Sequence, residues 1–373
     1  MRKAFSYRLY TNKTQDKSLT GLLDIARLFY NSALQERRDA WEHRVSINYY
    51  DQANQLKDIR TENTYCALLN FSATQDVLRR LDKSFKSFFR RIKAGEKAGY
   101  PRFKGKDRFD SITFPTYGDG VKLTDKLYIQ NVGKLRINLH RPIEGQIKTV
   151  SIKRKCSNWY AIFSCDLGDD IAPKTEFTNL VGIDVGLESF AVLSDGTVID
   201  NPRYFRHGEQ VLADRQRKLS AKQRGSNRRK DAKLLVAKAH QKIANQRTDF
   251  HHKLSRQLAD KYDFIAYEDL SINNMVKNHS LAKSISDAGW GQFLRFSCYK
   301  VEETGGTSVA VNPKGTSQEC SWCGDIVPKT LSDRIHNCPN CGKVAGRDYN
   351  ASRNILWRGL RLRGIPREAV CFS

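Results

Sequence analysis

Two pairs of cysteines, Cys320-x-x-Cys323 and Cys338-x-x-Cys341, constrain this chain more than any other feature of its sequence. Two thiolate pairs at this spacing, with fourteen residues between them, can close a tetrahedral site around one zinc ion. A glycine after each pair permits the tight turn that must follow it. Because four sulfur ligands leave no open coordination position, the zinc would be structural and would do no chemistry. Four unrelated cysteines are the alternative interpretation.

The charge of the chain indicates a polyanionic partner. There are 64 lysines and arginines against 40 aspartates and glutamates, which gives a formal net charge of +24. This exceeds what solubility requires and favours nucleic acid. A membrane surface would also attract such charge, but the sequence has no run of about 18 apolar residues, and its first residues lack the apolar stretch of a signal peptide. We therefore expect a cytoplasmic protein with no membrane contact.

The length of 373 residues and a hydrophobic content of 39% allow two or three folded domains. Five further cysteines are scattered singly, so we expect them to be reduced and mostly to serve packing. These five are Cys66, Cys156, Cys165, Cys298 and Cys371.

The first half of the chain changes its hydrophobic period once. Apolar residues recur at helical spacing from Lys17 to Trp41 and again from Leu78 to Ile92, which predicts a mainly helical first hundred residues. From residue 111 to 167 the period becomes two, with glycine-containing turns between the segments. This second pattern predicts a small antiparallel barrel or sandwich.

Two basic segments are candidates for contacts to nucleic acid. In the second helical stretch, lysines and arginines alternate with apolar positions, so that one face could pack while the other binds phosphate. A merely solvated basic face is the alternative. Residues 215–242 contain eleven lysines or arginines and one acidic residue. The predicted contact residues are Arg79, Arg80, Lys83, Lys86, Arg90 and Arg91 in the first segment, and Lys222, Arg224, Arg228, Arg229 and Lys230 in the second.

Three strands are predicted in close succession after residue 178, at 180–185, 189–193 and 198–200, the last two joined by the turn Ser194-Asp-Gly196. The first strand holds Asp184 between apolar neighbours, where an unpaired charge would cost several kcal/mol. A hairpin-linked sheet whose first strand bears an aspartate is how an RNase H-like fold begins.

Two more carboxylates occupy positions suited to the same site. Glu268 ends the apolar run Phe-Ile-Ala-Tyr, and Asp348 stands at the start of a predicted helix. Cleavage of a phosphodiester by two hard cations about 4 Å apart requires several carboxylates that converge on one point. We therefore predict that Asp184, Glu268 and Asp348 are catalytic and bind magnesium. Singly, each has an ordinary alternative: a turn cap, a partner for a lysine, or a helix N-cap.

At this point the motifs resemble a known family. The sequences Gly182-Ile-Asp184-Val-Gly and Tyr267-Glu268-Asp-Leu-Ser are similar to those of TnpB, the OrfB nuclease of insertion sequences, which is related to type V CRISPR effectors. Two further segments carry the resemblance, Thr316-Ser-Gln-Glu-Cys320-Ser-Trp-Cys323-Gly and Gly346-Arg-Asp348-Tyr-Asn-Ala-Ser-Arg-Asn-Ile. The opening of the chain also resembles the family, so the similarity covers nearly its whole length.

The resemblance implies an RNA-guided DNA endonuclease of a prokaryotic transposon, associated with the nucleoid while it is on DNA. Its partners would be a guide RNA from the transposon end and duplex DNA with a short adjacent motif, with one protein monomer per RNA favoured. Its cofactors would be two Mg²⁺ ions, or Mn²⁺, and one structural Zn²⁺. Asp184, Glu268 and Asp348 would be the three carboxylates of a RuvC nuclease, and the four paired cysteines would be the zinc ligands.

The same resemblance implies a multidomain α/β and all-β fold, in which an RNase H-like RuvC domain carries an inserted zinc ribbon and a wedge-type β-barrel carries a helical lobe. The implied boundaries are 1–16 for the first barrel strand, 17–98 for the helical recognition lobe, 99–178 for the wedge barrel, 179–315 for the first RuvC part, 316–345 for the zinc ribbon that binds target nucleic acid, 346–358 for the second RuvC part and 359–373 for a basic C-terminal tail.

One residue departs from the family pattern. Relatives often have Asp-Arg-Asp where this chain has Gly346-Arg-Asp348, so Asp348 is the single carboxylate of that segment. Two other functions remain as alternatives. A nuclease-inactive RNA-guided DNA-binding repressor would keep the charge and the ribbon but lose carboxylates. An accessory transposase that joins DNA would need a His-x-His pair, whereas His251 and His252 are adjacent.

Overall fold

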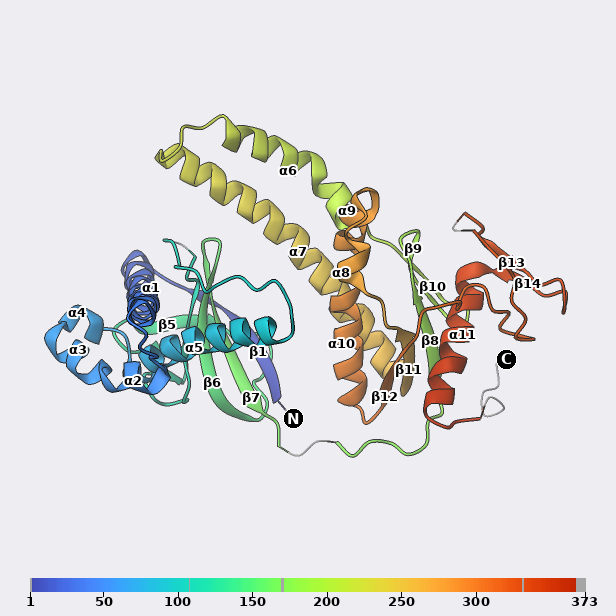
Figure 1. The fold of residues 1–373 in the computed structure, drawn as a ribbon, viewed down its shortest axis with the longest axis horizontal. Coiled ribbons are helices and arrows are strands. Elements are labelled where there is room, and N and C mark those ends of the chain that lie inside the picture. Colours follow the sequence, from blue (N-terminus) through green and yellow to red (C-terminus); the bar gives the residue numbers. More distant parts are fainter. Residues whose placement is uncertain (1, 107, 169–170, 331, 367–373) are drawn as a thin grey trace. The chain divides into compact units, whose positions relative to one another are not determined.

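The computed structural model describes residues 2–106, 108–168, 171–330 and 332–366. The chain divides into two compact units, residues 1–169 and 170–373, and each contains its own large sheet (Figure 1). Within the described ranges, no helix is both long enough and apolar enough to cross a membrane.

A seven-stranded antiparallel sheet forms the first unit, in the order β2-β6-β7-β1-β5-β4-β3. Its strands are β1 (Arg2–Tyr10), β2 (Ser111–Phe114), β3 (Val121–Leu123), β4 (Leu127–Ile129), β5 (Gly133–Asn138), β6 (Gln146–Lys155) and β7 (Asn158–Asp166). Alternate residues of β1 and β7 are buried, among them Tyr7 and Phe163, so one face of the sheet lines the core. The antiparallel, barrel-like sheet predicted for residues 111–167 is confirmed, and the strand from the N-terminus lies between β7 and β5.

Five helices lie between β1 and β2 in the chain: α1 (Lys13–Glu42), α2 (Tyr49–Asn54), α3 (Leu56–Glu62), α4 (Thr64–Ala67) and α5 (Phe71–Lys93). This confirms the predicted helical first hundred residues. The long helices α1 and α5 bury apolar faces in the core of the unit. A buried polar link joins them, because Arg37 of α1 lies 3.3 Å from the carboxylate of Asp82 and also donates to Gln52 of α2 at 2.9 Å.

The second unit has a five-stranded sheet in the order β10-β9-β8-β11-β12. Its strands are β8 (Leu180–Val185), β9 (Ser189–Leu193), β10 (Val198–Asp200), β11 (Phe264–Glu268) and β12 (Thr307–Val311). The first three are antiparallel and match the predicted strands, whereas β11 runs parallel to both β8 and β12. The helices of this unit are α6 (Tyr204–Ser220), α7 (Asn227–Lys261), α8 (Ile272–Met275), α9 (His279–Ala288), α10 (Trp290–Glu302) and α11 (Arg347–Leu362).

The helices α6 and α7 form a long hairpin that extends well beyond the sheet of its unit (Figure 1). Hydrogen bonds between residues of the hairpin itself stabilise the turn that joins the two helices. Ser226 caps α7 by accepting from the backbone of Arg229, and the Arg229 guanidinium donates to the carbonyls of Leu219 at 2.9 Å and Lys222 at 2.8 Å. The carbonyl groups at the end of α6 are thereby satisfied.

Helix α11 packs closely across β8 and β11. Gly182 of β8 permits this approach, because a Cβ at that position would lie 2.0 Å from the carbonyl oxygen of Ser352. Gly359 of α11 meets Ala266 of β11 in the same way. The helix continues to Leu362 and buries Leu360, so the prediction of a tail from residue 359 is wrong for its first four residues. Residues 367–373 of that tail, Cys371 among them, lie outside the described residues.

Candidate active site and zinc centre

The three predicted carboxylates lie on three elements that meet. Strands β8 and β11 are parallel neighbours in which Ile183 pairs with Tyr267, so Asp184 and Glu268, the residues that follow, lie at the same end of the sheet. Asp348 stands in the first turn of α11, which packs on both strands. The structure therefore brings together side chains that are far apart in the sequence.

The electrostatics of these carboxylates indicate crowding of negative charge. Burial raises the pKa of Asp184 well above its ordinary range, and the charges of Glu268 and Asp348 raise this pKa further. Burial also raises the pKa of Glu268. Arg347 opposes the effect at Asp184, and its Nε donates to Asp348 Oδ1 at 3.0 Å.

This donor set suits hard divalent cations. Carboxylate oxygens are the ligands that Mg²⁺ and Mn²⁺ prefer, and a divalent charge would relieve the repulsion that raises the pKa of Asp184. A buried carboxylate without such compensation is costly. The donor chemistry of Asp184, Glu268 and Asp348 therefore suits the predicted magnesium site, whereas among the described residues only the four zinc-site cysteines have ligand atoms that converge within 4.8 Å.

The four paired cysteines form a compact cluster in which all four sulfurs lie within 4.8 Å of one another. The sulfur–sulfur distances are 3.6 Å between Cys320 and Cys341 and 3.5 Å between Cys323 and Cys338. These are too long for disulfides and close to the roughly 3.8 Å edge of a tetrahedron with zinc–sulfur bonds of about 2.3 Å. Backbone donation from Cys341 lowers the pKa of Cys338 to about 7, which favours a thiolate there, whereas burial and the neighbouring thiols raise the pKa of Cys341 to about 12.

The two turns of the zinc centre have the geometry that the glycines predict. Gly324 and Gly342 have φ angles of +83° and +67°, and each donates its N–H to the carbonyl of the first cysteine of its pair. Strands β13 (Ile335–Asn337) and β14 (Val344–Gly346) form a short antiparallel ribbon next to the second pair. The cluster is able to hold one structural zinc ion.

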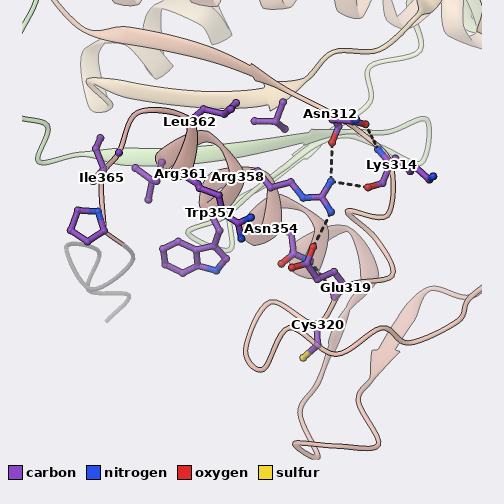
Figure 2. Close-up of a pocket in the computed structure, with 14 residues that line it drawn as sticks. Asn312, Lys314, Glu319, Cys320, Asn354, Trp357, Arg358, Arg361, Leu362 and Ile365 are labelled. Carbon is purple, nitrogen blue, oxygen red and sulfur yellow. Dashed lines mark hydrogen bonds and ion pairs between the residues drawn. The ribbon is translucent and has the colours of Figure 1, made fainter.

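A stripe of polar residues on α11, which none of the sequence motifs indicated, connects the carboxylate site and the zinc centre. Asn350, Asn354 and Arg358 are spaced by four residues and so share one face of the helix. Asn354 donates to the carbonyls of Thr316 and Glu319. Arg358 donates to the carbonyls of Asn312 and Lys314 and to the Glu319 carboxylate (Figure 2). Polar residues at a spacing of four on a helix that also carries Ala351, Ile355 and Leu356 are the signal in the sequence for this buried contact.

The predicted contact residues of α5 differ in their exposure to solvent and in their bonding partners. Arg79, Lys83, Lys86 and Arg90 are exposed, and Lys86 pairs with Asp82 at 2.9 Å. Arg91 is partly buried and pairs with Glu96. Arg80 is engaged inside the unit, since it bonds to Asp76 at 2.8 Å and to the hydroxyl of Thr113 on β2 at 2.6 Å. The sequence did not distinguish Arg80 from its exposed neighbours.

The predicted contact residues of the α6–α7 turn also include both exposed cations and one arginine that bonds within the protein. Lys222, Arg224, Arg228 and Lys230 are exposed at the junction of α6 and α7, whereas Arg229 is partly buried and bound to two carbonyls of the hairpin. Exposed cations on this turn are available to phosphate, while the guanidinium of Arg229 closes the turn.

Three family models match the chain. The OrfB_IS605 model, described as a probable transposase, matches residues 163–279, and the Cas12f1-like TNB domain matches residues 290–355, which include the four zinc-site cysteines. A helix-turn-helix model matches residues 1–45. In that region the structure instead forms the strand β1 and the single helix α1 of 30 residues.

Curated relatives are similar over almost the whole chain. A candidate RNA-guided DNA endonuclease of Streptomyces pristinaespiralis is 34% identical over 96% of this chain and 90% of its own length. The candidate RNA-guided DNA endonuclease InsQ of Escherichia coli K12 is 30% identical over 96% and 92%. The CRISPR-associated endodeoxyribonuclease Cas12f1 of Sulfoacidibacillus thermotolerans is 23% identical over 79% and 78%.

Solved structures share the fold. A Cas12f1 structure, in complex with sgRNA and target DNA, matches with a TM-score of 0.60 and 16% identity over 95% of this chain and 98% of that one. The mini-RNA-guided endonuclease CRISPR-Cas_phi3 matches with a TM-score of 0.51 and 9% identity over 96% and 92%. Since its identity to the curated relatives reaches 34% over nearly its full length, the chain belongs to the TnpB family, the OrfB proteins of IS605-type insertion sequences.

Proposed function

We propose that this protein is an RNA-guided DNA endonuclease encoded by a transposon. It binds a guide RNA from the transposon end, recognises a short motif beside the target, forms an RNA–DNA heteroduplex and cuts DNA. The observation that carries the proposal is the meeting of Asp184, Glu268 and Asp348 in a chain of net charge +24. The relatives named as RNA-guided DNA endonucleases support it.

The topology of the second unit supports a RuvC, RNase H-like assignment. Three antiparallel strands are followed by two parallel ones, and the first strand of the unit, β8, lies in the middle of the order β10-β9-β8-β11-β12. The first carboxylate is on this central strand, the second on its parallel neighbour and the third on the helix that packs on both. The barrel-like sheet and the helices of the first unit would be the wedge barrel and the recognition lobe.

The proposed mechanism assigns a role to each side chain of the site. Asp184, Glu268 and Asp348 would hold two Mg²⁺ or Mn²⁺ ions, which would supply an activated water and stabilise the leaving oxygen. Arg347 donates to Asp348 and limits the rotation of its carboxylate. The four cysteines would hold one zinc ion with no open coordination position, and this ion would stabilise the ribbon.

The exposed cations would bind the phosphate backbone of RNA or heteroduplex, contacts that position nucleic acid without specifying its sequence. We retain Arg79, Lys83, Lys86, Arg90 and Arg91 on α5, and Lys222, Arg224, Arg228 and Lys230 on the hairpin. Arg80 and Arg229 are left out because their guanidinium groups bond within their own units.

The test is cleavage by the purified complex. The protein is co-expressed with the DNA downstream of its gene and challenged, in magnesium, with a plasmid that carries a guide-matched target beside randomised bases. We expect cutting that is lost in Asp184→Ala while RNA and target binding persist. Loss of binding as well would mean that Asp184 is structural, and a complex without RNA would refute a guided function.

The same experiment separates the alternatives. Retention of RNA and target without cutting would favour the repressor and would make Gly346 the first position to restore to aspartate. Joining of transposon ends in a strand-transfer assay would favour a transposase. The structure gives His251 a different use, because it is fully buried and its ring nitrogens contact Gln292 and the Ala288 carbonyl.

A further inference from the structure

The segment 312–321, here called the knuckle loop, connects β12 to the first zinc-site cysteine and passes beside Glu268. We propose that Thr316 in this loop is a positioning residue for Glu268, and that zinc bound at Cys320 holds Thr316 in place. The inference rests on the proposed function, because it takes Glu268 as a ligand of the catalytic metal ions. Through this contact, the zinc centre and the carboxylate site would influence each other's affinity for metal ions.

The first step is the contact between Thr316 and Glu268. The Thr316 hydroxyl oxygen lies 2.5 Å from Glu268 Oε1 and 3.0 Å from the carbonyl oxygen of Pro313. A hydroxyl has one proton, so it donates to one of these acceptors at a time, and an ionised carboxylate is the stronger acceptor. Thr316 is only 4% exposed, so its side chain has little freedom to turn away. The hydroxyl therefore orients the carboxylate of Glu268.

The second step is what holds Thr316. Its carbonyl accepts from the Asn354 side chain at 2.8 Å, and the same amide donates to the carbonyl of Glu319 at 2.6 Å. Asn350 adds a two-way clamp, since it donates to the Glu319 carbonyl at 2.7 Å and accepts from the backbone N–H of Ser321 at 2.9 Å. Both asparagines are nearly fully buried. The loop is thus fixed to the helix that carries Asp348.

Arg358 adds a third anchor farther along the same face of α11. Its guanidinium spans the beginning and the end of the loop, with bonds to the carbonyls of Asn312 and Lys314 and to the Glu319 carboxylate, as Figure 2 shows. Its charge also lowers the pKa of Glu268 against the effect of burial. Arg358 therefore acts on both the backbone of the loop and the carboxylate that the loop orients.

The third step is the link to zinc. Cys320 stands between Glu319 and Ser321, the two residues whose backbone Asn350 clamps. A zinc ion bound to Cys320 and the asparagine side chains of α11 would therefore restrain the same short stretch of backbone, residues 319–321. Coupling between the binding of two ligands is reciprocal, so zinc would strengthen binding of the catalytic cations, and those cations would strengthen binding of zinc by the same factor. Outer-shell partners of metal ligands typically change metal affinity 10- to 100-fold.

The experiment measures Mn²⁺ binding to the zinc-loaded full-length protein without nucleic acid, from the electron paramagnetic resonance signal of free Mn²⁺. Thr316→Val should weaken the Asp184-dependent Mn²⁺ site about 10-fold with zinc content unchanged, and Thr316→Ser should restore it. Thr304→Val is the matched control, because the Thr304 hydroxyl also donates to a carbonyl three residues earlier but forms no hydrogen bond to a carboxylate within the described part of the chain.

A second arm uses the wild-type protein and Asn354→Ala. At equilibrium, a several-fold higher concentration of a chromophoric chelator should be needed to remove zinc when Mn²⁺ is added, and Asn354→Ala should lose this dependence. An Asp184-dependent Mn²⁺ site that Thr316→Val leaves unchanged, or a zinc affinity that does not depend on Mn²⁺, would overturn the coupling while leaving the nuclease proposal intact. Mn²⁺ binding that Asp184→Ala does not reduce would overturn both.

Discussion

Single residues decide how closely the elements of the second unit approach. Gly182 is the clearest case, because a side chain there would meet the backbone of α11, at 2.0 Å from the Ser352 oxygen and 2.7 Å from the Leu356 nitrogen. Backbone cannot move aside as a flexible side chain can. By contrast, a Cβ on Gly346 would have no heavy atom within 4 Å, and the φ of this residue is −60°. The two glycines of the nuclease motifs therefore differ in what they tolerate.

We expect Gly182→Ala to destabilise the protein by about 3 kcal/mol, since α11 must shift away from β8 to make room. The same shift would move Asp348 relative to Asp184, so cleavage should fall with stability. Thermal unfolding followed by circular dichroism measures the first effect. Gly346→Asp is the control, and its melting temperature should stay within a few degrees of the wild type, because a capping aspartate gains only a few tenths of a kcal/mol over glycine. A large loss in this variant would contradict the open space at Gly346.

The raised pKa of Asp184 predicts a pH dependence of stability without divalent cations. A carboxyl whose pKa is higher in the folded than in the unfolded protein contributes stability that is present below the unfolded value of about 4, and this is lost as the pH rises through the folded value. Asp184→Asn removes the ionisation, so its melting temperature should exceed that of the wild type more at pH 8 than at pH 5. Magnesium-free buffer without a chelator keeps the zinc in place, and added Mg²⁺ should reduce the difference. An advantage that does not change with pH would contradict this assignment.

At the scale of elements, the hairpin of α6 and α7 presents a turn in which exposed and structural cations alternate. Lys222, Arg224, Arg228 and Lys230 are exposed, whereas Arg229 bonds to the carbonyls at the end of α6. A phosphate contact and a cap on a helix end are distinct physical roles. They are therefore separable by measurement, although the residues are neighbours in the sequence.

Replacing the four exposed cations of the turn with glutamine should weaken RNA binding and reduce the slope of log K against log salt by about 3, with little change in stability. Arg229→Gln should do the opposite, lowering stability by about 1 kcal/mol while the salt slope changes by less than about 1. Filter binding at several salt concentrations, together with thermal unfolding, distinguishes the two variants. If both affected the slope equally, the assignment of Arg229 to the hairpin itself would be wrong.

At the scale of the whole molecule, the chain contains separate hydrophobic cores. The core of the first unit consists of residues from Phe5 to Cys165, whereas the cores of the second unit begin at Val181. In the first unit α1 and α5 pack against β2 of its sheet, and in the second unit α11 packs on β8 and β11. Each unit therefore has the apolar interior that an independent domain needs.

We expect a fragment of residues 1–168 to fold alone, because its core requires no residue of the second unit. It should unfold cooperatively on heating and retain the helical content of α1 and α5. Circular dichroism of the purified fragment is sufficient as a measurement, with the full-length protein as reference. A broad, non-cooperative transition would show that the first unit depends on the rest of the chain.

Much of the fold and of the candidate site followed from local patterns. The bounds of β8, β9 and β10, the helical first hundred residues and the turns after Cys323 and Cys341 depend on periods of two or 3.6 residues and on glycine geometry, which neighbouring residues set. The prediction failed at the start of the tail, because the composition after Gly359 is basic although Leu360 is buried. Burial against a distant strand leaves little trace in local composition.

The amino-acid sequence sets which chemical groups are available: two thiolate pairs that can close around one zinc ion, and carboxylates at the ends of strands and at the start of a helix. Which of these groups meet depends on how the strands and helices pack in the folded protein. This packing brings Asp184, Glu268 and Asp348 together, turns Arg80 and Arg229 inward, and joins the zinc centre to Glu268 through Thr316 and a stripe of polar residues on α11. The reason is physical, since spacing along the chain sets local geometry, whereas the contacts between elements depend on how their surfaces pack.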